Sequence, residues 1–119
     1  MKKTLVFGAS LKPDRYSYVA VKRLVANEIE TEAFGLKEGY IDTVQVKTTL
    51  EHMRDIHTLT LYIGPQRQAA YYDSFLALSP KRVIFNPGTE NPELYDILEK
   101  QGILVEVACT LVLLGTGQY

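Results

Sequence analysis

Short apolar runs rich in β-branched residues alternate along this chain with segments whose apolar residues recur at helical spacing. The runs lie at residues 4–7, 31–34, 59–63, 83–85 and 104–107. Runs of this kind are typical of buried strands, and their alternation with helices is typical of a parallel sheet covered on both faces. We therefore expect a three-layer α/β fold whose five principal strands have the spatial order 3-2-1-4-5.

Three of the intervening segments carry helix signals. The first begins near residues 15–17 and places its apolar residues on one stripe. The second covers about residues 65–78 and ends before a proline. The third runs over residues 92–101, where Asn91 suits the N-cap and Gly102 suits the C-cap. We expect all three helices to pack on the sheet.

The stretch at residues 37–57 has the least regular pattern. It favours a short additional strand at residues 43–46 and a short helix at residues 49–54. The sequence contains no repeat, low-complexity tract or linker, so we expect residues 1–119 to form a single domain.

Composition narrows the classes of function. With 46% hydrophobic and 23% charged residues, the chain is ordinary for a globular protein. Its net charge of −1 gives no reason to expect nucleic acid or an anionic membrane as a partner. The single cysteine, Cys109, cannot form an intramolecular disulfide, and the N-terminal apolar run is too short for a signal peptide. We therefore expect a cytoplasmic protein.

The loops that follow the expected strands are the place to look for a ligand, because ligands of parallel α/β sheets bind beyond the carboxyl ends of the strands. The first loop, GASLKPDRYSY at residues 8–18, has only one of the three glycines of a dinucleotide-binding turn. It places Lys12 and Arg15 among serine hydroxyls in front of a helix, which suits a phosphate group. Asp14 either reduces the positive charge of this loop or caps the helix. The alternative to a phosphate site is a charged loop that is simply exposed to solvent.

The loop after the second strand separates the nucleotide cofactors. An NAD site usually has an acidic residue there to accept hydrogen bonds from the ribose hydroxyls. This chain has Lys37, which favours a ligand with an extra ribose phosphate, such as NADP or coenzyme A (CoA). The neighbouring Glu38 is an acidic residue of the kind that an NAD site needs, so NAD stays an alternative ligand.

Catalytic and metal-binding signals are sparse. His52 and His57 precede the third principal strand, away from the expected ligand edge, and favour structural or surface roles. Cys109 is either a nucleophile at a helix N-terminus or a small buried residue, and we favour the buried residue. No spacing suits a metal site. We therefore expect no catalytic residues and no metal.

Four stretches carry a resemblance to a known family: residues 8–18, YIGPQRQ at 62–68, IFNPGTENPEL at 84–94 and VEVACTLVLLGTGQY at 105–119. On these stretches the chain resembles the small stand-alone CoA-binding domain proteins. These proteins are related to the CoA-binding domains of succinyl-CoA synthetase and of acyl-CoA synthetases. The resemblance runs nearly end to end and implies a Rossmann-like fold with CoA or an acyl-CoA as its cofactor.

The resemblance also implies positions for the parts of CoA. The diphosphate is expected at the first loop, the 3′-phosphoadenosine after the second strand, and the adenine or pantetheine after the third, with the fourth loop on the same edge. These positions are, in that order, Gly8, Ala9, Ser10, Lys12, Arg15, Tyr16 and Ser17; Leu36 and Lys37; Ile63, Gly64 and Pro65; and Asn86, Pro87 and Gly88.

Two departures from the family limit what the resemblance implies. Many relatives have a Pro-Val-Asn-Pro-like stretch after the second strand, where this chain has AFGLKEG at residues 33–39. The phosphorylated histidine of the synthetases belongs to a domain that is absent from this sequence. The resemblance therefore implies ligand binding more firmly than catalysis.

Three functions follow from the sequence as alternatives. The favoured one is a non-catalytic CoA-binding module, acting as a sensor or beside a separate catalytic chain. The second is a small NADP- or NAD-using enzyme or redox sensor, and the third is a domain that acts only through protein contacts. Apolar segments that contain Tyr71, Tyr72 and Tyr95 suggest a face for a homodimer.

Overall fold

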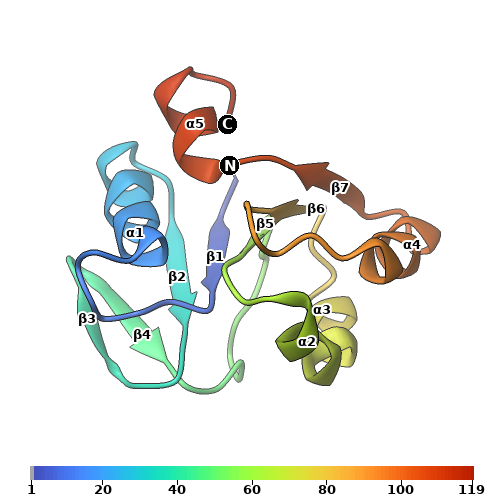
Figure 1. The fold of residues 1–119 in the computed structure, drawn as a ribbon. Helices are drawn as coiled ribbons and strands as arrows, with labels where there is room; N and C mark the ends of the chain where they lie inside the picture. Colours follow the sequence, from blue (N-terminus) through green and yellow to red (C-terminus); the bar gives the residue numbers. More distant parts are fainter. Residues whose placement is uncertain (1) are drawn as a thin grey trace.

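The computed structural model describes residues 2–119 and contains one seven-stranded sheet (Figure 1). The strands are β1 Thr4–Phe7, β2 Thr31–Phe34, β3 Gly39–Ile41, β4 Val44–Lys47, β5 Thr58–Leu61, β6 Arg82–Phe85 and β7 Leu104–Val107. Their spatial order is β3-β4-β2-β1-β5-β6-β7, and within the described residues only the β3–β4 pair is antiparallel. The predicted α/β class with a Rossmann-like parallel sheet is confirmed.

The strand order differs in detail from the predicted order 3-2-1-4-5. The third principal strand, β5, pairs with β1 in the register Thr4↔Thr58, and the place beside β2 belongs to β4. The reason lies in the burial of the two strands. All four residues of β5 are buried, which suits a strand in the middle of the sheet with both faces covered, whereas β4 alternates buried and more exposed residues, which suits a place next to the edge strand β3. The additional strand predicted at residues 43–46 is therefore present and joins the sheet near its edge.

Helices cover both faces of the sheet (Figure 1). They are α1 Tyr16–Ala26, α2 Pro65–Gln68, the 3₁₀ turn η1 Ala69–Tyr71, α3 Tyr72–Leu78, α4 Pro92–Lys100 and α5 Thr110–Gly115. On the face of α1, Val21 and Leu24 pack with Val6 in one apolar cluster. On the opposite face, Phe75 and Leu94 belong to a second cluster with the core strands. Each helix of the described chain is too short or too polar to span a membrane.

Local signals decide where the helices begin and end. The backbone N–H of Leu94 donates to Asn91 Oδ1 at 3.4 Å, which confirms the N-cap of α4, and Gly102 has the positive φ of +75° expected after its C-terminus. The predicted helix at residues 49–54 is wrong. His52 and Asp55 have φ values of 67° and 58°, a left-handed conformation that interrupts a right-handed helix.

Candidate functional site

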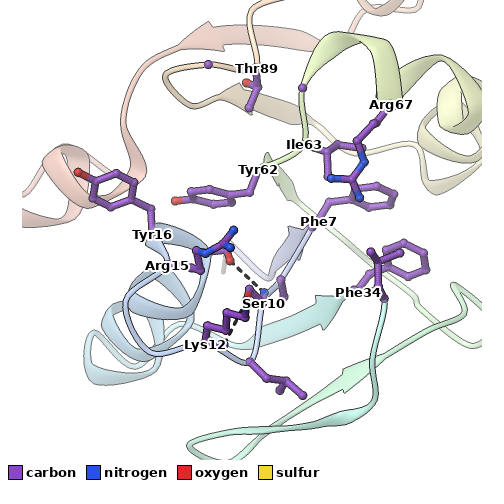
Figure 2. A pocket seen from close by; sticks show the side chains of 18 of the residues that line it. Phe7, Ser10, Lys12, Arg15, Tyr16, Phe34, Tyr62, Ile63, Arg67 and Thr89 are labelled. Atoms are coloured by element: carbon purple, nitrogen blue, oxygen red, sulfur yellow. Dashed lines mark hydrogen bonds between the residues drawn. The ribbon is translucent and has the colours of Figure 1, made fainter.

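A cavity of about 700 Å³ opens at the carboxyl ends of the strands (Figure 2). It is lined by the loops that follow β1, β2, β5 and β6. Because the chain leaves β1 to one side for β2 and later returns to the other side for β5, this edge is the topological switch point of the sheet. The volume lies within the range of small-molecule sites, roughly 300–1,000 Å³.

Thirteen of the fifteen predicted site residues line this cavity. They are Gly8, Ala9, Ser10, Lys12, Arg15, Tyr16, Ser17, Leu36, Lys37, Ile63, Gly64, Pro87 and Gly88. Pro65 and Asn86 are not among the lining residues. Pro65 is the first residue of α2, where a missing backbone N–H is tolerated.

Asn86 is buried below the cavity and joins three elements. Its Nδ2 donates to Thr60 Oγ1 at 2.6 Å and to the carbonyl of Leu61 at 2.9 Å. Its Oδ1 accepts from the backbone N–H of Thr110 at 2.9 Å. The side chain therefore holds β5, the end of β6 and the start of α5 together.

Two glycines allow the loops around the cavity to approach one another. A Cβ on Gly8, which has φ +95°, would lie 2.7 Å from Ile63 Cγ2. A Cβ on Gly35 would lie 2.2 Å from the carbonyl oxygen of Ala9. Real Cβ atoms do not come so close to such neighbours, so both positions require glycine. Close contact between the loops therefore accounts for both glycines.

Serine side chains set the shape of the first loop. The backbone N–H of Ser10 donates to Ser17 Oγ at 3.0 Å, and that of Lys12 donates to Ser10 Oγ at 3.1 Å (Figure 2). The N-cap residue of α1 is Arg15, and no side chain caps this helix. Asp14 therefore does not serve as the cap. The first-turn N–H groups of α1 point to the loop without a side-chain acceptor.

Four basic residues line the cavity: Lys12, Arg15, Lys37 and Arg67. Among residues 2–119, the ion pairs are made by other cations, and none involves these four. No Asp or Glu belongs to the described lining. The cavity is thus locally positive in a chain whose net charge is −1.

Eight lining residues were not predicted from the sequence: Phe7, Leu11, Phe34, Gly35, Tyr62, Arg67, Tyr71 and Thr89. Phe7 and Phe34 end predicted strands, so their position at the ligand edge was a usable signal. Their rings stack with centroids 4.6 Å apart, and Tyr71 meets Phe7 edge-on at 4.9 Å. Burial of the Tyr62 side chain raises the pKa of its phenol to about 12, so the phenol is protonated at neutral pH.

Gln68 anchors two of the lining loops and was not among the predicted site residues, although it ends the stretch YIGPQRQ. It is completely buried, and its Nε2 donates to the carbonyls of Ile63 at 2.9 Å and Thr89 at 2.8 Å. Its Oε1 accepts from Asn91 Nδ2 at 2.9 Å. This amide therefore fixes the loop after β5 to the loop after β6.

The histidines and the cysteine lie outside the described lining. His52 is exposed, and His57 Nδ1 lies 2.8 Å from Thr58 Oγ1 at the amino end of β5. Cys109 is half-buried and is the N-cap residue of the six-residue helix α5, so it is less buried than the sequence favoured. In residues 2–119, no group of three or more His, Cys, Asp and Glu side chains suits a metal ion.

The chain is similar to one protein family and to several solved structures. A family model described as a CoA binding domain matches residues 2–115. The crystal structure of a protein described as uncharacterized is 44% identical, with a TM-score of 0.96, and the match covers 100% of this chain and 98% of that one. No curated protein matches the chain.

Two more distant solved structures share the fold. One, from Thermus thermophilus, is 20% identical with a TM-score of 0.87, and the match covers 99% of this chain and 90% of the other. A hypothetical protein from Pyrococcus horikoshii is 23% identical with a TM-score of 0.82 over 93% of this chain and 80% of its own.

Proposed function

This chain belongs to the CoA-binding domain family, and we propose that its cavity binds coenzyme A or an acyl-CoA. The observation that carries the proposal is the set of lining cations, Lys12, Arg15, Lys37 and Arg67, none of which has an ion-pair partner among residues 2–119. CoA brings a diphosphate and a ribose phosphate, which are the anionic groups that such cations bind.

In the proposed complex the first loop holds the diphosphate. Lys12 and Arg15 supply positive charge, and the uncapped start of α1 supplies backbone N–H groups and the positive end of a helix dipole. Leu36 and Lys37 flank the adenosine end. Ile63 and Gly64 contact the adenine or the pantetheine, with Pro87 and Gly88 on the same edge.

We propose that this protein binds its ligand without catalysing a reaction. The proposal is supported by the cavity lining, which within the described chain includes no His, Cys, Asp or Glu to act as an acid–base group near neutral pH. Tyr62 is held protonated by a pKa of about 12. Such a domain acts as a sensor of CoA or delivers it to a separate catalytic chain.

A homodimer is the alternative protein partner in this proposal. The face suggested from the sequence is not free, because Tyr71, Tyr72 and Tyr95 are partly buried and pack against the core. The proposal rests instead on Leu104 and Val107, which are 59% and 56% exposed on the edge strand β7. Edge strands and exposed apolar residues are where chains associate. Light scattering at high micromolar concentration distinguishes the dimer from the monomer.

Calorimetric titration with CoA, acetyl-CoA, NADP and NAD tests the proposed ligand. CoA and acetyl-CoA are expected to bind, and NAD is expected to bind weakest because no lining carboxylate accepts hydrogen bonds from its ribose hydroxyls. NADP is the informative competitor, since it also carries an extra ribose phosphate. Tighter binding of NADP than of CoA would overturn the proposal.

A further inference from the structure

The loops that follow β5 and β6 form one wall of the cavity, and a buried amide joins them. The Nε2 of the completely buried Gln68 donates to the carbonyl oxygens of Ile63 at 2.9 Å and Thr89 at 2.8 Å. Both residues line the cavity, Ile63 after β5 and Thr89 after β6, and in Figure 2 they lie on the side of the cavity away from Lys12. One side chain therefore sets the separation of the two loops.

A second buried amide fixes the direction of the first. Asn91 Nδ2 donates to Gln68 Oε1 at 2.9 Å and to the hydroxyl oxygen of Tyr72 at 2.8 Å. Asn91 Oδ1 accepts from the backbone N–H of Leu94 at 3.4 Å, and the Tyr72 hydroxyl donates to Glu93 Oε1 at 3.0 Å. Reversal of either amide would set acceptor against acceptor and donor against donor, so each amide has one orientation.

The same wall contacts the first loop of the cavity. Ile63 lies two residues beyond the end of β5 and is 4% exposed. It packs directly on the backbone of Gly8, because a Cβ on Gly8 would lie 2.7 Å from Ile63 Cγ2. A shift of Ile63 would therefore change its contact with the loop that carries Lys12 and Arg15.

We infer that Gln68 and Asn91 are positioning residues that set the spacing of the cavity loops and thereby the affinity for CoA. This inference rests on the proposed function. Neither side chain belongs to the described lining, so each acts through the loops that it holds. A site that already has its binding geometry binds more tightly, because less ordering remains to occur with the ligand. Without the Gln68 amide, the carbonyls of Ile63 and Thr89 lose their shared donor and the loops can separate.

Calorimetric titration with CoA compares the wild type with Gln68→Met, which keeps the length of the side chain and removes its amide. CoA should bind this variant about 10- to 100-fold more weakly. The matched control is Gln66→Met, the same change at an exposed position of α2, which should keep the CoA affinity within about twofold. A second control, Ile103→Ala, removes a buried side chain next to the amino end of β7. It should lower stability and keep the affinity within about twofold.

The variant Asn91→Ser separates positioning from helix capping. Serine caps a helix N-terminus about as well as asparagine, so α4 keeps a cap, but serine has no amide to donate to Gln68 and Tyr72. CoA should bind this variant about 10-fold more weakly than the wild type. A role of Asn91 in capping alone predicts unchanged affinity.

Thermal unfolding of each variant, followed by circular dichroism, identifies a temperature at which it is folded for the titration. Wild-type affinity in folded Gln68→Met overturns the role of Gln68, and wild-type affinity in folded Asn91→Ser overturns the role of Asn91. An equal loss of affinity in Ile103→Ala would assign the effect to lower stability and overturn both. If Gln68→Met does not fold, Asn91→Ser decides the inference. A wild type that does not bind CoA overturns the proposed function, and this inference with it.

Discussion

The arginines of this protein fall into two kinds that differ in their partners. Arg82, on β6, is 5% exposed, and its Nη1 lies 3.2 Å from Glu106 Oε1 while its Nε donates to Thr58 Oγ1 at 3.1 Å. Its guanidinium also lies 4.5 Å from the ring centroid of Tyr119. Arg15 and Arg67 are exposed at the cavity, and neither has an ion-pair partner among residues 2–119.

Charge supports the fold at Arg82 and is available for a ligand at Arg15 and Arg67. A buried cation needs its partners, because an isolated charge away from water is costly. An exposed cation at a cavity contributes little to stability, and its charge can be neutralised by a bound anion. Arg82 should therefore matter for folding, and Arg15 for binding.

The largest expected effect is on stability. Arg82→Ala should lower the free energy of unfolding by about 3 kcal/mol, because it removes the bonds to Glu106 and Thr58 and the packing on Tyr119. Urea unfolding measures this change. The control, Arg54→Ala, removes an exposed arginine and should change stability by less than about 0.5 kcal/mol. Equal losses of unfolding free energy in Arg82→Ala and Arg54→Ala would show that the buried arginine does not stabilise the fold more than an exposed one.

A smaller effect, on affinity alone, is expected at the first loop. Arg15→Ala should weaken CoA binding by about 10- to 100-fold, which is roughly 1.5–3 kcal/mol, through loss of a charge-assisted phosphate contact. Its free energy of unfolding should stay within about 0.5 kcal/mol of the wild type. Calorimetric titration and urea unfolding measure the two quantities.

Two controls sharpen this prediction. Arg23→Ala, at the other end of α1, should leave CoA affinity unchanged, as should Cys109→Ala, since Cys109 is outside the described lining. Unchanged affinity in Arg15→Ala, or lost affinity in a folded Cys109→Ala, would mean that the site lies elsewhere.

The smallest expected effect is a pH dependence near Arg82. Burial lowers the pKa of His57, and the positive charges of Arg82, Lys2 and Lys81 lower it further. The unfolded chain then takes up a proton at His57 near pH 6.5, before the folded chain does. The stability contribution is therefore complete above this pH and is lost as the pH falls through the lowered pKa.

This dependence is measured as the change in unfolding free energy between about pH 7.5 and about pH 5.5. His57→Gln should reduce the loss of stability on acidification. Arg82→Ala should reduce it too, because one of the charges that lower the pKa of His57 is gone. A loss as large in His57→Gln as in the wild type would assign the dependence to other groups.

Much of the candidate site could be predicted because its parts are local in the sequence. The first loop carries Lys12 and Arg15 between a strand and a helix. Lys37 lies in the loop that follows β2, three residues after the strand ends. Which loops lie at the ligand edge follows from the direction of parallel strands. The cytoplasmic location and the single-domain organisation stay predictions.

Arg67 and Gln68 belong to the stretch YIGPQRQ that carries the family resemblance, but local sequence does not show which of its side chains faces a cavity. One faces the cavity and its neighbour is buried, and this difference arises from the contacts of α2 with loops distant in the sequence. Similarly, Tyr71 reaches the cavity only because the chain turns at η1 and packs its ring on Phe7. Side-chain direction in such a short, irregular helical segment depends on tertiary packing.

Local patterns predicted six of the seven strands, the first helix and the ends of α4, because apolar periodicity and capping act between residues close in the chain. They predicted neither β3 nor the 3₁₀ turn η1, which divides the helix expected over residues 65–78. Tertiary structure alone decided that β5 lies beside β1 and β4 beside β2. Strand pairing depends on which arrangement covers the fully buried strands, such as β5, on both sides, and that competition involves the whole sheet. Lys37, Arg67 and Tyr71 line one cavity as a consequence of that order.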